Sequence, residues 1–572
     1  MLHFLLFSSL VGYAWAKTVT YDWYIRWRLA APDGFVRPII SVNGIWPPPT
    51  IEANVGDTIV VNAYNDLGNE TTSLHFHGMY QNGTAAADGP VGVAQCGIAP
   101  GRYFQYRFVG NPAGTHWWHS HEKAQYTDGL RGKMIIHDPV WEASLKVHRQ
   151  IYLSVSDWWH QQSPFMVHDY LSPNNTDGSL PTPNSFLLND SRAPPRFRLK
   201  RDRRYLVRIV SFAGLVCGQF HIANHTLTVV AIDGEPVRPA ITDTIAICAG
   251  QSYDFIVLGN QYEQAANYIL KMTTDMLTGP IPSSQTRALI GDIALENNTS
   301  IAAGISPNGS FTGPYGSQGV SYIPTLLNFN WTAQGILDDA TLVPLDNEPL
   351  FKNVTRRINF RTNQVYYEGI GSRISIGIQP YTEPRVPSLQ SALTTGQLAL
   401  DWTTYGPGTS PYVVRHNDIV EIYMENPQIW PHPMHLHGHN FQIAGRGLGS
   451  WDGNEDSLYQ TPARRNNLVI PPFGWFLIRF IADNPGVWFH HCHIDLHLVG
   501  GMAATIVEAP DVLQLQQRIP IQNIEACKAD YRCSVGTCNC RLDKLSEEES
   551  NEQCNTIFNN VNPARYGALL PC

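Results

Sequence analysis

The residues best suited to chemistry lie near the C-terminal end of the chain, in His490-His491-Cys492-His493. In an extended strand, successive side chains point to opposite faces, so Cys492 points one way while His491 and His493 point the other. A cysteine with two histidines and a weak thioether forms a blue-copper electron-transfer centre, and Met502 follows shortly afterwards. One strand can therefore hold a thiolate-bound metal on one face and imidazole-bound metals on the other, and can pass electrons between them.

Further His-x-His pairs supply the remaining imidazoles. They are His75 and His77, His119 and His121, and His435 and His437. With His491 and His493 they give eight neutral nitrogen ligands, which suits a cluster of three copper ions. His432 and His497 are left for the copper of Cys492. A single His-x-His pair is more simply a surface strand or a stray zinc site, but four such pairs in one chain are not expected without copper.

The elements that must position these residues are predicted to be strands. The chain has 572 residues, of which 43% are hydrophobic and 15% charged, with 46 Gly and 40 Pro. Strand-like runs separated by Gly and Pro turns favour an all-β protein built of Greek-key β-sandwiches. The chain divides into three units and a Cys-rich C-terminal extension, with predicted boundaries at residues 17–139, 140–300, 301–510 and 511–572.

A faint internal repeat supports this division. The run Val55-Gly56-Asp57 opens a strand in the first unit, and Asn417-Asp418 opens a similar strand in the third. Both runs precede His-x-His pairs, whereas the second unit has a strand pattern at 205–210 but no such pair. We therefore expect the metal cluster to lie between the first and third units, because its ligands come from both.

Charge and targeting signals limit the partners and the compartment. The formal charge of −9 and the pI near 6.1 exclude nucleic acid as an expected partner. Residues 1–16 resemble a secretory signal that ends in a small-x-small pattern, and no later apolar run is long enough to span a bilayer. Asn-x-Ser/Thr triplets then predict an exported glycoprotein, either secreted or retained in the secretory pathway or cell wall. We expect it to be a monomer. These triplets include Asn69, Asn82, Asn189, Asn308, Asn330 and Asn353.

In order and spacing, the four histidine motifs resemble those of the multicopper oxidases, a family of laccases, ascorbate oxidases and iron-transport ferroxidases. The resemblance runs from about Thr18 to Pro510. It implies three cupredoxin-like domains and four copper ions, with the middle domain as a spacer that helps to wall the substrate site. It also implies a reaction in which single electrons from a donor pass through Cys492 and reduce O2 to water.

The resemblance also implies a role for each matched residue. The type 1 copper takes His432, Cys492 and His497, with Met502 as the axial ligand. The type 2 copper takes His75 and His435, and the type 3 pair takes His77, His119, His121, His437, His491 and His493. The acids that supply protons fall on Asp88 and Asp495, although an Asp-Gly pair such as Asp88-Gly89 is also a common turn. His116 and His490 lie beside these motifs but match no ligand position.

The sequence indicates the electron donor less directly than it indicates the metal ligands. The stretches 115–121 and 483–488 most resemble the iron-transport ferroxidases, which feed electrons to the type 1 copper through three outer carboxylates. By approximate alignment, those positions fall on Leu180, Thr278 and Pro407, which cannot supply hard oxygen ligands for iron. The membrane helix of that branch is also missing from the sequence. These observations put a ferroxidase second and an ascorbate oxidase third.

A phenolic or naphtholic donor is therefore the primary expectation. Laccases often place one carboxylate near the type 1 histidine; the corresponding stretch 212–217 has no acid, and Asp169 or Asp275 could take its place. An apolar mouth would suit a polycyclic phenol, such as a pigment precursor undergoing oxidative coupling. A thioether from Met502 generally lowers the reduction potential of a blue copper, which favours electron-rich donors.

Two other classes of protein fit less well. A copper-storage protein or an inactive structural homologue would be expected to lack some ligands, and here every matched position is filled. Nine cysteines remain beside Cys492 and are expected to form disulfides in an exported chain, with Cys217 and Cys248 able to pair within the second unit. Because nine is odd, one thiol is expected to be free or to pair between chains. Cys96 resembles the family cysteine that bridges the first domain to the C-terminal region. A soft-metal site at Cys538-Asn539-Cys540 is the competing interpretation of the extension.

Overall fold

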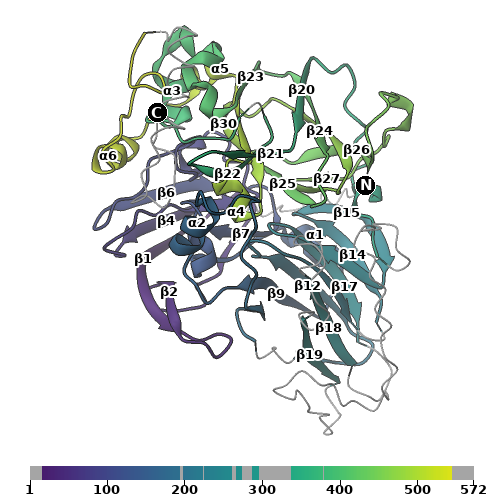
Figure 1. The fold of residues 1–572 in the computed structure, drawn as a ribbon. Coiled ribbons are helices and arrows are strands. Elements are labelled where there is room, and N and C mark those ends of the chain that lie inside the picture. The colour runs from purple at the N-terminus through teal and green to yellow at the C-terminus, as the bar shows by residue number, and fades with distance from the viewer. Residues whose placement is uncertain are drawn as a thin grey trace, which may run out of the picture.

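A computed structural model describes residues 16–192, 197–222, 225–259, 266–273, 287–295, 336–377 and 379–543. These residues form three β-sandwich domains, which are coloured from purple through teal to green in Figure 1, followed by a short helical segment. The predicted all-β class is confirmed. The predicted boundary at 300/301 lies outside the described residues, while those at 139/140 and 510/511 fall within helices α1 and α5, so the exact boundaries stay predictions.

Domain 1 packs two four-stranded sheets, ordered β2-β1-β4-β6 and β3-β8-β7-β5. Along β1, Trp23 and Ile25 are buried while their neighbours in sequence are exposed, because alternate side chains of a strand face the core. The strands are β1 (Thr18–Ala30), β2 (Arg37–Val42), β3 (Ile51–Asn54), β4 (Thr58–Asn65), β5 (His75–His77), β6 (Tyr103–Val109), β7 (Gly114–His119) and β8 (Arg131–His137).

Domain 2 combines a six-stranded sheet, ordered β10-β9-β12-β17-β14-β15, with a five-stranded sheet, ordered β11-β19-β18-β13-β16. Its strands are β9 (Arg149–Trp158), β10 (Ser185–Leu188), β11 (Phe197–Leu199), β12 (Arg204–Ser211), β13 (Cys217–Ile222), β14 (Leu227–Ile232), β15 (Glu235–Thr242), β16 (Thr244–Ile247), β17 (Ser252–Leu258), β18 (Ala266–Thr273) and β19 (Arg287–Leu295). The predicted pairing of Cys217 with Cys248 is confirmed, and it joins β13 to the end of β16.

Domain 3 packs two five-stranded sheets, ordered β20-β24-β29-β26-β27 and β23-β31-β30-β25-β28, and adds the hairpin β21-β22. Its strands are β20 (Arg356–Arg361), β21 (Asn363–Tyr367), β22 (Gly371–Ser375), β23 (Pro411–Val414), β24 (Ile419–Asn426), β25 (His432–Leu436), β26 (Phe441–Leu448), β27 (Arg464–Arg465), β28 (Asn467–Ile470), β29 (Gly474–Ile481), β30 (Gly486–Cys492) and β31 (Ala503–Glu508).

Helices are short and connect or cap the sheets. The α-helices are α1 (Pro139–Ser144), α2 (Ser163–Leu171), α3 (Ser388–Thr394), α4 (Asp495–Val499), α5 (Pro510–Gln516) and α6 (Ile521–Ala529). The 3-10 turns are η1 (Ala85–Ala87), η2 (Gln125–Asp128), η5 (Asp339–Thr341), η6 (Gly396–Leu400), η7 (Trp402–Tyr405), η8 (Pro407–Thr409) and η9 (Glu455–Ser457). Within the described part of the chain, no helix is long and apolar enough to cross a membrane.

The internal repeat expected from the sequence is present in domains 1 and 3. β4 and β24 have the same length and the same burial pattern, and each pairs in parallel with the first strand of its domain. The aspartate before each strand closes the same turn, since Asp57 accepts a hydrogen bond from the amide of Asn54 and Asp418 accepts one from the amide of Arg415. The two domains therefore present equivalent strands to the interface between them.

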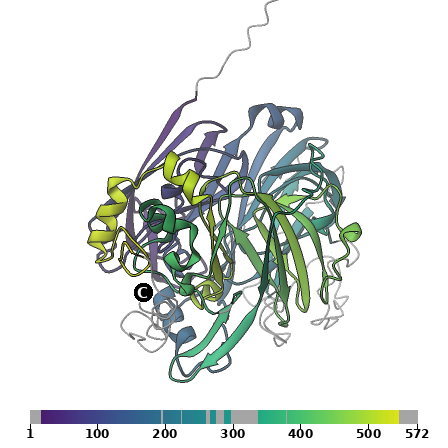
Figure 2. The ribbon, with the colours of Figure 1, turned by 90° about the horizontal axis from the view of Figure 1, so that it is seen from above.

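The C-terminal extension folds back onto domain 1. In Figures 1 and 2 the yellow helix α6 lies along the purple and blue strands of that domain, and it contacts β6. Cys527 of α6 is disulfide-bonded to Cys96, and a second disulfide joins Cys533 to Cys540. These bonds agree with the expected disulfides and exclude Cys540 from a soft-metal site. Cys554 and Cys572 lie outside the described residues, as do the predicted signal sequence up to residue 15 and the triplets at Asn308 and Asn330.

Candidate metal centre

Antiparallel strand pairs bring the predicted histidines together. β5 pairs with β7 so that His75 lies opposite His119 in domain 1. β25 pairs with β30 so that His435 lies opposite His491 in domain 3. Directly opposite residues of an antiparallel pair have Cβ atoms about 4.5–5.5 Å apart, so each pairing sets two imidazoles side by side. The histidines of the two domains meet between them, as the distribution of motifs along the chain predicts.

The cysteine and its two histidines form a separate group on the other face of β30. The Cys492 sulfur lies 3.7 Å from Nδ1 of both His432 and His497. Those two Nδ1 atoms are 3.2 Å apart, so three donor atoms converge on one point. Met502 is fully buried beside them: its amide donates to the carbonyl of His497, and its carbonyl accepts from the amide of Cys492. The predicted mononuclear set is therefore assembled.

The other eight histidines form one buried group. Donor atoms lie within 4.8 Å of one another in three overlapping triplets: His75, His77 and His119; His75, His435 and His437; and His121, His437 and His491. His493 joins them, because its Nε2 lies 3.3 Å from Nδ1 of His77. The first two triplets share His75, and the last two share His437. This overlap suits several metal ions held close together rather than a single ion.

Burial keeps these rings neutral. It lowers the pKa of His77, His119, His121, His435, His437 and His491 well below the usual value, with repulsion between neighbouring rings as a further cause. The pKa of His493 and that of His497 fall to about 3 for the same main reason. Neutral imidazoles keep the lone pair that a metal needs. Burial also raises the pKa of the Cys492 thiol, so thiolate formation there requires a bound cation.

The donor atoms fit copper. Four buried Nε2 atoms, those of His75, His119, His121 and His435, have no hydrogen-bond partner in the described structure, although buried polar atoms nearly always have one. A group of neutral imidazole nitrogens suits copper, and a cysteine with two histidines and a thioether suits the blue-copper type. Both donor sets are therefore complete for the ions that the sequence predicts.

Two carboxyl groups predicted to handle protons lie beside the histidines. Asp88 is fully buried, and its Oδ2 lies 2.8 Å from Nδ1 of His437. Asp495 lines a small hollow together with Tyr126 and Lys123, at the edge of the histidine group. Burial and the nearby Asp157 raise the pKa of Asp495 well above its usual value, which favours the protonated carboxyl.

Gln428 is a functional residue that motif reading missed. Its Oε1 accepts a hydrogen bond from Nε2 of His432 at 2.8 Å, so one ring of the mononuclear set is covered on its outer edge. His497 has no such cover in the described contacts and is 5% exposed, while His432 is fully buried. No motif marks Gln428, but its position four residues before His432 could have drawn attention to it.

The remaining histidines named from the sequence lie outside these groups. His116 is buried between Gly78 and Gly234, and Nδ1 of His490 lies 3.1 Å from the carbonyl of His435. Burial lowers the pKa of each to about 4. Both are neutral core histidines, as expected for residues that match no ligand position.

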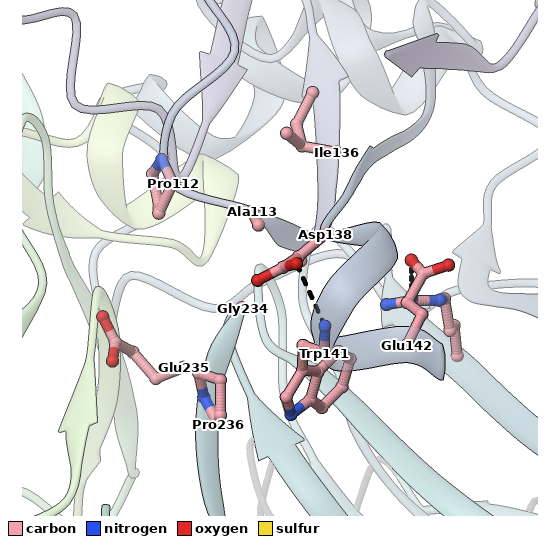
Figure 3. A pocket seen from close by; sticks show the side chains of 11 residues that line it. Pro112, Ala113, Ile136, Asp138, Trp141, Glu142, Gly234, Glu235 and Pro236 are labelled. Carbon is pink, nitrogen blue, oxygen red and sulfur yellow. Dashed lines mark hydrogen bonds and ion pairs between the residues drawn. The ribbon is translucent and has the colours of Figure 1, made fainter. Parts of the chain in front are cut away.

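A separate pocket of about 230 Å³ lies where domain 2 meets domain 1. Figure 3 shows Glu235 and Pro236 on one side of it and Trp141 and Glu142 on the other. The pocket contains none of the predicted metal ligands among its lining residues. Glu235, at its edge, is linked to the histidine group by hydrogen bonds through Asn440 and Asn466.

Comparisons with known proteins identify the family. Models described as multicopper oxidase match residues 25–140, 149–290 and 381–512. The iron transport multicopper oxidase fetC of Epichloe festucae is 36% identical over 91% of this chain and 81% of its own length. The iron transport multicopper oxidase FET3 of Gibberella zeae is 34% identical over 99% of this chain and 88% of its own.

Comparison with solved structures points to the same family. The crystal structure of Fet3p, described as a multicopper oxidase that functions in iron import, has a TM-score of 0.84 at 31% identity, covering 93% of this chain and 98% of that one. A laccase from Botrytis aclada has a TM-score of 0.72 at 26% identity, covering 90% and 91%. The chain therefore belongs to the multicopper oxidase family. This confirms the predicted copper cofactor and an oxidase that uses O2 and a reducing substrate.

The prediction of a phenolic or naphtholic donor is wrong. The relatives that match nearly the whole chain are named iron transport multicopper oxidases. The prediction relied on the absence of carboxylates at Leu180, Thr278 and Pro407. However, the side chain that covers His432 is Gln428, which that alignment overlooked, and Thr278 lies outside the described residues.

Proposed function

We propose that this protein is a ferroxidase that takes one electron from each of four Fe(II) ions and reduces one O2 to two waters. The observation that supports this most directly is the similarity, over nearly the whole chain, to proteins named iron transport multicopper oxidases. The burial and convergence of the two donor sets support an active enzyme rather than a storage protein, since every predicted ligand position is filled.

The ligand assignment is part of this proposal. Type 1 copper would be held by His432, Cys492 and His497, with Met502 as a further, weaker ligand. Type 2 copper is held by His75 and His435, and the type 3 pair by His77, His119, His121, His437, His491 and His493. Bound copper supplies the one-electron redox chemistry that removes electrons from Fe(II) and gives four of them to dioxygen. Cys492 is bonded through the peptide chain to His491, within β30, and to His493, which follows it, so the backbone connects the two donor sets covalently.

Proton supply is assigned to Asp88 and Asp495. Reduction of O2 to two waters consumes four protons, and both carboxyl groups lie at the edge of the histidine group. Burial raises the pKa of Asp495 and so favours its protonated form, and its Oδ2 has no hydrogen-bond partner in the described structure. A carboxyl group in this position can supply a proton to the histidine group, while Asp88 orients the His437 ring through its Oδ2.

Electrons enter near His497, the more exposed ring of the mononuclear set. Helix α4 carries this histidine and contacts α2, which carries Asp169. Asp169 is exposed, and its hydrogen bonds with Gln161 and His168 lower its pKa. An ionised carboxylate at this surface attracts Fe(II) by simple charge, without having to ligate it tightly. Asp275, the other acid considered from the sequence, lies outside the described residues.

We also propose that the protein is exported through the secretory pathway. The described residues contain three disulfides, and such bonds persist in oxidising compartments. Exposed Asn82 and Asn353 of the Asn-x-Ser/Thr triplets are suitable glycan acceptors. The Asn189 side chain, in contrast, is occupied by hydrogen bonds to the Ser154 amide and the Tyr152 carbonyl.

Oxygen consumption by the copper-loaded protein tests the proposed donor. Fe(II), a dihydroxynaphthalene and ascorbate are compared at equal concentrations, with Cys492→Ser as the blank. We expect the highest kcat/KM with Fe(II), and no activity in the blank because electron entry is lost. A naphthol or ascorbate kcat/KM above that of Fe(II) would contradict the ferroxidase assignment, whereas inactivity toward all three would contradict the enzyme itself.

A further inference from the structure

The histidine group is organised around two stacked ring pairs, each of which joins domain 1 to domain 3. The rings of His75 and His437 are 4.0 Å apart and nearly parallel. The rings of His77 and His435 are 3.8 Å apart and closer still to parallel. Each pair must be held at its outer edge, because a free imidazole could rotate and turn its lone pair away from the centre.

One residue holds each pair. Asp88 accepts from Nδ1 of His75 through its main-chain oxygen at 2.7 Å, and bonds Nδ1 of His437 through its carboxylate at 2.8 Å. Asn466 repeats this arrangement from the opposite domain. Its main-chain oxygen lies 2.7 Å from Nδ1 of His435, and its Oδ1 lies 3.0 Å from Nε2 of His77. In each case the side chain crosses the domain interface.

The orientation of the Asn466 amide is determined by a chain of hydrogen bonds that begins in domain 2. Glu235, paired with Arg464, can only accept, so Asn440 must turn its Nδ2 toward Glu235, at 2.7 Å. The Oδ1 of Asn440 then faces Nδ2 of Asn466, at 3.2 Å. This leaves Oδ1 of Asn466 to accept from the His77 ring. Figure 3 shows Glu235 at the edge of the pocket, where this chain starts.

We propose that Asn466 is a positioning residue that, under the direction of Glu235 and Asn440, fixes His77 in the tautomer with its proton on Nε2. The lone pair of Nδ1 then faces the centre, where it lies 3.3 Å from Nε2 of His493. His75 and His435 bond through Nδ1 instead and keep Nε2 for the centre. His77 therefore needs a different support, and the amide supplies it.

This assigns domain 2 a role beyond that of a spacer. It contributes no histidine to the described groups, yet Glu235 sets the tautomer of a ligand in domain 1 through two residues of domain 3. Partners of this kind, one bond beyond the ligand, typically change metal affinity or activity by about 10–100-fold when removed. The inference rests on the proposed copper ligands but does not depend on the identity of the electron donor.

Replacement of Asn466 tests the inference, with four variants compared. Asn466→Leu keeps the side-chain volume but removes the acceptor, whereas Asn466→Asp keeps an acceptor for Nε2 of His77. Asn440→Leu breaks the chain one bond further away. Asn523→Leu, at another buried asparagine on α6, is the matched control for loss of a buried amide. Copper per chain, the EPR-detectable fraction of that copper and the blue absorption are measured on each.

We expect Asn466→Leu to lose the EPR-silent, coupled copper pair while keeping the blue absorption of the Cys492 site. Re-oxidation of the chemically reduced protein by O2, which needs no iron, should slow by about 10–100-fold. Asn466→Asp should restore both properties, and Asn440→Leu should show the same loss in weaker form. Asn523→Leu should behave as the wild type.

Two results would overturn the inference. One is full copper content with a normal coupled pair in Asn466→Leu. The other is an Asn466→Asp variant as impaired as Asn466→Leu, since an acceptor alone should suffice. If Asn466→Leu does not fold, Asn440→Leu decides, because a normal coupled pair in that variant shows that the chain from Glu235 does not set the ring. A failure of the ferroxidase assignment would leave all of these readings intact.

Discussion

The Asp88 carboxylate in domain 1 lies 2.8 Å from Nδ1 of His437 in domain 3. Asn466 makes the reciprocal contact from domain 3 to His77 in domain 1. The two contacts share their geometry but differ in chemistry, because a carboxyl can take up and release a proton and an amide cannot. One side of the histidine group is thus merely held in place, while the other is held by a residue that can also exchange protons.

Asp88→Asn separates these two roles. Asparagine can still accept from Nδ1 of His437, so we expect the variant to bind copper and to keep its blue absorption. Because it cannot relay protons, re-oxidation by O2 should fall by about 10²-fold, the lower end for loss of a general acid–base group. Stopped-flow re-oxidation of the reduced protein measures this, with Asp57→Asn as a control at a structural aspartate. Wild-type re-oxidation in Asp88→Asn would remove Asp88 from the proton path.

The clustering of the predicted ligands could be anticipated from the sequence because its signal is local. Alternation along one strand separates Cys492 from His491 and His493, and cross-strand pairing then follows from the fold. Asn466 and Gln428 could not be found in this way. Their roles depend on contacts between segments with no shared motif, such as the hydrogen bond between Asn466 and His77, 389 positions apart.

The electron donor was mispredicted for a related reason. The absence of an acid at an aligned position says little when the loop geometry around the mononuclear site is unknown. Only the folded chain shows that Gln428 covers His432 and that His497 is the more exposed ring.

Gln428→Glu is predicted to lower both the KM for Fe(II) and the reduction potential of the type 1 site. A carboxylate at this position accepts a stronger, charge-assisted hydrogen bond from Nε2 of His432, and it donates electron density to that ring, which lowers the reduction potential of the type 1 site. Its charge also attracts Fe(II), which should lower KM by about 2–5-fold. Redox titration of the blue absorption and steady-state oxygen uptake check both effects.

Gln428→Leu provides the control for this prediction. It removes the acceptor without adding charge, so KM for Fe(II) should not fall, and the reduction potential should rise rather than drop. If Gln428→Glu and Gln428→Leu change the potential in the same direction, the hydrogen bond to His432 does not tune the site.

The disulfide between Cys96 and Cys527 is predicted to contribute more stability than that between Cys533 and Cys540. The first closes a sequence separation of 431 residues and the second one of 7, and a longer loop loses more entropy in the unfolded chain when it is closed. Double replacement by alanine should cost about 6 kcal/mol for the first pair and about 2 kcal/mol for the second. Thermal unfolding of the two double variants measures this difference, and equal losses would contradict it.

Asp530 is predicted to make stability depend on pH. Burial raises its pKa to about 6 even though it pairs with Arg532, whereas an unfolded aspartate has a pKa of about 3.9. Below pH ~4 the residue is protonated in both states. As the pH rises from there toward 6, the unfolded chain releases this proton first, so the relative stabilisation of the folded state is lost.

Asp530→Asn should remove this loss. At pH 7 the variant is expected to be more stable than the wild type by about 1–2 kcal/mol, with partial exposure of the side chain reducing the full effect. At pH 4 the two should unfold at the same temperature. Thermal unfolding across this range checks the prediction, with Glu525→Gln on the exposed face of α6 as the control. A stability difference that is the same at pH 4 and pH 7 would mean that packing, rather than ionisation, separates Asp530→Asn from the wild type.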